Sequence, residues 1–172
     1  MSGFWIKQVT ALYRLELKIV TAAQSILLLV LRIYFGFQFS KGGWGKLVHI
    51  QSTTEFFSGL GIPLAGINAY LAGTVEFVGG ICLFIGIGSR LITIPLIFTM
   101  LVAYATAHTS ELQSIFANPN LYLKAPPFLF LLTSTPVLLF GPGCFSADWV
   151  IGKLVRNHAR APESPPPRQT VV

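Results

Sequence analysis

Three ionisable residues of this chain lie in apolar or glycine-rich surroundings, namely Arg32, Lys46 and Glu76. Glu76 lies within "AGTVEFVGGICLFIGIGSR", residues 72–90, and Arg32 within the apolar run that precedes it. A charge at the centre of a bilayer costs roughly 2.5–3.5 kcal/mol, so neither side chain is expected to face lipid unpaired. Paired groups of this kind either hold helices together, bind the polar atoms of a ligand or relay protons.

Composition indicates that the segments around these residues cross a membrane. The chain has 172 residues, of which 53% are hydrophobic and 10% charged, with a mean hydropathy of +0.67. Soluble domains carry about 25% charged residues, and a span needs about 20 apolar residues. The sequence therefore predicts an all-α membrane protein, a four-transmembrane-helix bundle with amphipathic interfacial helices at both termini. Its four apolar stretches are residues 19–39, 62–87, 91–107 and 125–140.

The net charge of +6 follows membrane orientation and gives no reason to expect a nucleic-acid partner. Basic residues gather on the side that carries both termini, and few lie on the other side. This positive-inside bias predicts a multi-pass membrane protein with both termini cytoplasmic. The predicted inner residues are Lys7, Arg14, Lys18, Arg90, Lys153, Arg156, Arg160 and Arg168, and the outer ones are Lys41, Lys46 and Lys124.

The sequence predicts that the chain has three parts. Residues 1–18 mix aromatic, apolar and basic residues, without the features of a cleavable signal peptide, and are predicted to form an interfacial helix. Residues 19–160 form the membrane domain, with a helix break at Gly42, Gly43 and Gly45 and a final amphipathic segment that follows a cap at Ser146. Residues 161–172 are proline-rich and predicted to be disordered.

Arg32 and Glu76 are predicted to form a buried ion pair. Counted from residue 19, Arg32 lies about thirteen residues, roughly 20 Å, above the inner boundary, and Glu76 lies about 17 Å above its own inner end. Two interpretations stay open. The pair either fixes two helices to each other, or lines a polar pocket in which Arg32 and Glu76 are catalytic. Buried ion pairs are weak evidence for stability, which favours the second.

Four further residues are candidates for substrate binding beside Arg32 and Glu76. Lys46 lies in "GGWGK", Tyr34 and Trp44 would suit a flat aromatic ligand, and His108 ends the third apolar stretch. Each is also typical of a membrane interface, where basic and aromatic side chains reach the headgroups. No metal site is expected, because the two cysteines and three histidines have no ligand-like spacing. The sequence holds no nucleotide-binding loop.

Four stretches together resemble the DoxX family of small membrane proteins. The resemblance covers roughly residues 25–155 and implies a four-helix bundle of the inner membrane. The stretches, in chain order, are "LRIYFGFQFSKGGWGKL", "GIPLAG", "VEFVGGICLFIGIGSR" and "GPGCFSADWVIG".

The resemblance also implies quinone-linked redox chemistry. It leads to the hypothesis of a quinone-type substrate whose oxygen Arg32 holds, while Glu76 fixes Arg32 and passes protons and Lys46 assists. No intrinsic cofactor is expected, so a catalytic member needs a redox partner subunit or acts on quinone directly. Two alternatives are a non-catalytic membrane subunit that docks a redox partner and a small-solute carrier. The sequence does not identify partners other than the lipid bilayer, and it leaves the oligomeric state open.

Overall fold

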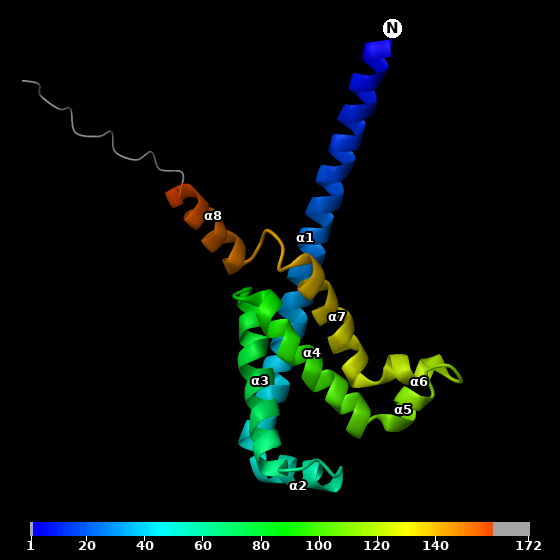
Figure 1. Ribbon diagram of the computed structural model, residues 1–172, viewed down its shortest axis with the longest axis vertical. Helices are drawn as coiled ribbons and strands as arrows, with labels where there is room; N and C mark the ends of the chain where they lie inside the picture. Colours follow the sequence, from blue (N-terminus) through cyan, green and yellow to red (C-terminus); the bar gives the residue numbers. More distant parts are fainter. Residues whose placement is uncertain (1, 160–172) are drawn as a thin grey trace, which may run out of the picture.

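The computed structural model describes residues 2–159 of the chain, with side chains from residue 8 to residue 157 (Figure 1). Every regular element within these residues is an α-helix, which confirms the predicted all-α class. The predicted proline-rich tail at 161–172 lies outside the described residues.

Helix α1 (Ser2–Val48) is one continuous element of 47 residues. It has no break at the predicted boundary between residues 18 and 19. The predicted break at Gly42, Gly43 and Gly45 is wrong, because all three glycines are helical. Glycine disfavours a helix by about 1 kcal/mol in water. In a bundle, however, it lets a neighbouring helix approach, and the close packing of α1 offsets that cost.

Helix α3 (Ala65–Ile85) runs antiparallel beside the C-terminal half of α1 (Figure 1). The two helices meet along a seam of small residues spaced seven apart, Gly36 and Gly43 on α1 and Gly73 and Gly80 on α3. A Cβ added to Gly36 would lie 2.7 Å from the backbone N of Phe84, and one added to Gly43 would lie 2.7 Å from the carbonyl O of Gly73. The two backbones are therefore in direct contact.

Helices α3 and α4 (Ser89–Thr106) form a tight antiparallel hairpin. Two glycines make the turn between them in the left-handed region, Gly86 at φ +83° and Gly88 at φ +56°. Gly86 caps α3, since its N–H and that of Ile87 both donate to the carbonyl of Cys82.

The remaining span candidate is α7 (Pro126–Phe140), which packs on α4 and also contacts α1. The buried apolar cluster lies where these helices meet, with Leu28, Leu96 and Val137 among its members. Short helices lie at one end of the bundle, namely α2 (Ile50–Gly59), α5 (Thr109–Gln113) and α6 (Pro119–Lys124) (Figure 1).

Within the described residues, three helices are long and apolar enough to cross a membrane: α1, α3 and α4. Helix α7 has 15 residues and falls short of the usual ~20. These helices fit the predicted membrane-protein class, whereas the count of four spans stays a prediction.

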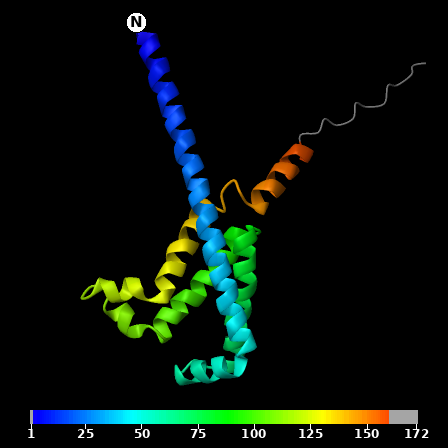
Figure 2. The same ribbon diagram turned by 180° about the vertical axis from the view of Figure 1, so that it is seen from behind.

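Helix α8 (Ala147–Ala159) begins after the predicted cap, since the N–H of Trp149 donates to Ser146 Oγ at 3.1 Å. Its side chains combine basic and apolar groups, and Lys153 Nζ lies 5.1 Å from the Trp149 ring centre. Both views show α8 and the N-terminal half of α1 extending from the same end of the bundle (Figure 2). That this end of the bundle faces the cytoplasm stays a prediction.

Candidate functional site

An ion pair between Lys46 and Glu76 lies in the interface of α1 and α3. The Lys46 ammonium donates to Glu76 Oε2. The Glu76 side chain is 6% exposed, whereas that of Lys46 is 31% exposed. The pair therefore has a buried anionic end and a cationic end that reaches the surface of the bundle.

Two glycines of α1 allow this pair to form. A Cβ on Gly42 would lie 3.5 Å from Glu76 Oε2, and one on Gly43 would lie 2.8 Å from the Glu76 carbonyl carbon. Lys46 lies one turn further along, in the last turn of α1, where the helix dipole favours a cation. Its carbonyl also accepts a hydrogen bond from Thr53 Oγ1 of α2 at 3.2 Å.

Arg32 is 1% exposed and is held by backbone carbonyls at the opposite end of the interface. Its Nε donates to Leu83 O at 3.1 Å and its Nη2 to Phe145 O at 3.2 Å. Its Nη1 donates to Pro142 O. The guanidinium thus lies where α3 and α7 end, and the unpaired carbonyls of helix C-termini attract cations.

The predicted Arg32–Glu76 ion pair is wrong. In the antiparallel seam Gly36 lies beside Gly80 and Gly43 beside Gly73, so Arg32 lies level with the end of α3. The end of α3 lies about two turns, or roughly 11 Å, from Glu76. The prediction placed the start of the first span at residue 19. In the structure α1 enters the bundle nearer to Ser25, where the loop after α7 contacts it at Gly143.

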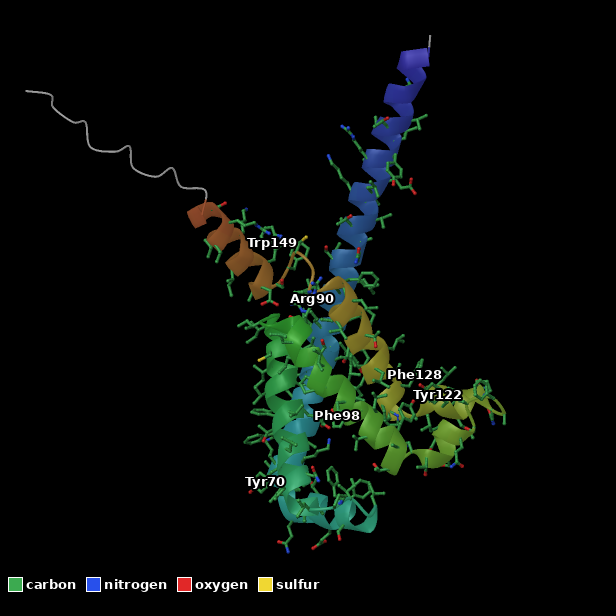
Figure 3. All side chains as sticks on the ribbon, viewed as in Figure 1. Tyr70, Arg90, Phe98, Tyr122, Phe128 and Trp149 are labelled. Carbon is green, nitrogen blue, oxygen red and sulfur yellow. The ribbon has the colours of Figure 1, made fainter. Side chains whose placement is uncertain are left out.

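Asp148, in the first turn of α8, fixes the start of this helix to the turn between α3 and α4. Its Oδ1 and Oδ2 accept the N–H groups of Gly88 and Ser89 at 2.8 and 3.0 Å, and its own N–H donates to Gly86 O. The Asp148 carboxylate therefore caps the N-terminus of α4, a role that was not predicted from the sequence. Figure 3 shows Arg90 at the same junction, where its Nε would lie 3.1 Å from a Cβ on Gly141.

The other predicted site residues are dispersed. Trp44 is 56% exposed and lies 5.4 Å, ring centre to ring centre, from Phe77, the neighbour of Glu76. Tyr34 is 58% exposed and packs edge-on against Phe35, away from the ion pair.

His108 joins α4 to α5 at one end of the bundle. Its Nδ1 lies 3.5 Å from Glu111 Oε1 and its ring 6.2 Å from that of Tyr104. A hydrogen bond from Ser110 holds the pKa of the Glu111 carboxyl below its usual range. Among the described side chains, His108 has no contact with Lys46 or Glu76.

The sequence carried a signal for the Lys46–Glu76 pair. Gly36 and Gly43 are spaced seven residues apart, as are Gly73 and Gly80. If the two pairs are aligned antiparallel, the first helix must continue through Gly43, which brings Lys46 close to the turn that carries Glu76. Interpreting the glycines as helix breakers hid this alignment.

We expect the two halves of the ion pair to differ in their effect on stability. Lys46→Met leaves a buried carboxylate without its partner and should destabilise the protein by about 3 kcal/mol. Glu76→Gln leaves a lysine that reaches the surface and should cost about 1 kcal/mol or less. The double variant should be more stable than Lys46→Met alone. Thermal unfolding of the four proteins in one detergent measures this, and equal losses for the two single variants would contradict it.

Comparison with known proteins supports the family resemblance. Residues 27–109 match the model of the DoxX family. The match includes Arg32, Lys46 and Glu76 and ends before α8, which carries Asp148. The chain is also similar to "Putative oxidoreductase CatD" of Bacillus subtilis, with 27% identity over 129 residues that cover 75% of this chain and 90% of that protein. No solved structure matches. The family match thus confirms the predicted DoxX resemblance over residues 27–109.

Proposed function

We propose that this protein takes part in quinone-linked oxidation and reduction in the inner membrane, and that Lys46 and Glu76 bind the quinone-type molecule. The observation that carries the proposal is the buried Glu76 carboxylate, paired with Lys46 inside an apolar bundle. Ionisable groups within spans commonly mark ligand or proton pathways. The similarity to the Bacillus subtilis protein named "Putative oxidoreductase CatD" supports the redox class.

Each residue of the pair has a distinct role in this proposal. The Lys46 ammonium has three N–H donors, one of which Glu76 engages, and another donates to a quinone carbonyl oxygen. Glu76 passes protons to that oxygen, since conversion of a quinone to a quinol takes up two electrons and two protons. Trp44 and Phe77 offer flat apolar surfaces beside the pair. A redox partner supplies the electrons.

The structure changes the role that we assign to Arg32. Its guanidinium is buried and donates to three backbone carbonyls of α3 and of the loop after α7. We therefore assign it to holding these segments together. Binding of the substrate oxygen passes to Lys46 in the revised proposal.

Glu76→Gln is expected to abolish quinone binding while the protein still folds. Glutamine has the shape of glutamate but carries no negative charge, so it no longer holds the Lys46 ammonium in position for the quinone oxygen. The wild-type protein should co-purify with a quinone that can be extracted and identified, and it should gain thermal stability with decylubiquinone. Glu55→Gln, at an exposed acid on α2, is the matched control. An undiminished response in Glu76→Gln would remove Glu76 from the site.

A membrane subunit that docks a redox partner is the second candidate function. The N-terminal half of α1 extends away from the other helices and exposes Leu12, Leu15 and Ile19 (Figure 1). A helix with this exposed apolar side suits a protein partner. A purified protein that holds no quinone and shows no thermal shift with decylubiquinone would favour this function over the first.

A further inference from the structure

An open groove of about 500 Å³ lies between α1 and the loop that leads from α7 to α8. Its lining is mostly apolar, and Leu17, Ala22, Ile26 and Phe145 form much of it. Lys18 is the charged residue in this lining. The groove is separate from the Lys46–Glu76 pair, which lies in the half of α1 beyond Arg32.

The position of the groove along the bundle corresponds to the lipid headgroup layer. Helix α3 ends at Ile85, α4 begins at Ser89 and α7 ends at Phe140, so the spans end together. Helix α1 passes this level near Ser25, where a Cβ on Gly143 would lie 3.4 Å from the Ser25 Cα. Lys18 follows seven residues, or about 10 Å, further out. The headgroup layer is about 5–8 Å thick on each side of the hydrocarbon core, so the long Lys18 side chain can reach it.

The charge around the groove is positive. Among the described residues, Lys18 forms no ion pair. Glu16 precedes it by two positions and therefore points to the opposite side of α1. Asp148, a nearby acidic group in the first turn of α8, accepts hydrogen bonds from the N–H groups of Gly88 and Ser89. Arg90 lies at the same end of the bundle and adds positive charge (Figure 3).

We propose that the groove binds one anionic phospholipid of the surrounding leaflet. Its phosphate lies against the Lys18 ammonium, and the first part of an acyl chain lies along Ala22, Ile26 and Phe145. An apolar groove with a single unpaired cation at its outer end matches the order of groups in such a lipid, headgroup first and hydrocarbon below. A free phosphate would use only Lys18, and a neutral lipid would use only the apolar lining.

The test uses the full-length protein, purified and delipidated in an uncharged detergent. Melting temperature and native mass spectrometry are recorded with phosphatidylglycerol, with phosphatidylcholine of the same acyl chains, and with inorganic phosphate. The variants are Lys18→Gln, Ala22→Trp, which fills the groove, and Lys41→Gln, the matched control at an exposed lysine of α1 outside the groove. The comparison of lipids on the wild-type protein requires no variant to fold.

We expect phosphatidylglycerol to stabilise the wild-type protein more than phosphatidylcholine does, with one retained lipid per chain. Lys18→Gln should bind phosphatidylglycerol about fivefold more weakly, as expected for one basic contact to an anionic lipid. Ala22→Trp should lose the retained lipid, and Lys41→Gln should behave like the wild type. The proposal is overturned by equal stabilisation with both lipids, by full stabilisation with inorganic phosphate, or by unchanged binding in both groove variants.

Discussion

Gly43→Ala is expected to lower the melting temperature of the protein by about 5–10 °C, from an overpacking cost of about 2–3 kcal/mol. The added methyl group would overlap the backbone N of Phe77 and lie 2.7 Å from the carbonyl O of Gly73. Backbone atoms of a helix cannot rotate away as a flexible side chain can, so α1 and α3 must move apart. This separation would also pull Lys46 away from Glu76.

Gly45→Ala is the matched control for this prediction. Gly45 lies two residues along the same helix, and a Cβ there would meet no atom within 4 Å. The control should melt at the wild-type temperature or slightly above, because alanine favours a helix over glycine. Thermal unfolding followed by circular dichroism in one detergent compares the variants. A Gly43→Ala protein as stable as Gly45→Ala would show that the two helices do not meet along this seam.

Arg32→Met is expected to destabilise the protein by about 3–5 kcal/mol, comparable to the loss of one partner from a buried charged pair. The substitution leaves the carbonyls of Leu83, Pro142 and Phe145 without their donor in a buried place. Each unsatisfied buried acceptor costs about 1–3 kcal/mol. The loop from 141 to 146 should then detach from α3, which limited proteolysis of the purified protein would detect together with a lower melting temperature.

Two further variants show whether the shape of the arginine matters. Arg32→Lys keeps the charge but replaces a planar fork by a single ammonium, so it should fall between the wild type and Arg32→Met. Arg14→Met removes an arginine from the exposed part of α1 and should leave the melting temperature unchanged. If Arg32→Met has the same melting temperature as Arg14→Met and its loop stays resistant to protease, the carbonyl contacts do not hold the loop in place.

The class of the protein and the identity of its unusual residues were evident from the sequence. Low charge and long apolar runs are sufficient to indicate membrane helices, because the bilayer requires them wherever the chain crosses. Glu76 and Arg32 were conspicuous because an unpaired charge in hydrocarbon is costly.

The pairing of these residues was decided only by the tertiary structure. Glycine carries opposite implications in a single helix and in a helix pair, and only packing against α3 shows that Gly42 and Gly43 belong inside α1. Because α1 continues through Gly43, the register of α1 against α3 places Lys46 beside Glu76 and Arg32 beside the end of α3. The partners of Arg32 are backbone carbonyls, which every residue possesses and no sequence pattern marks. A sequence thus shows that a buried charge needs a partner, whereas the close packing of two helices decides which group that partner is.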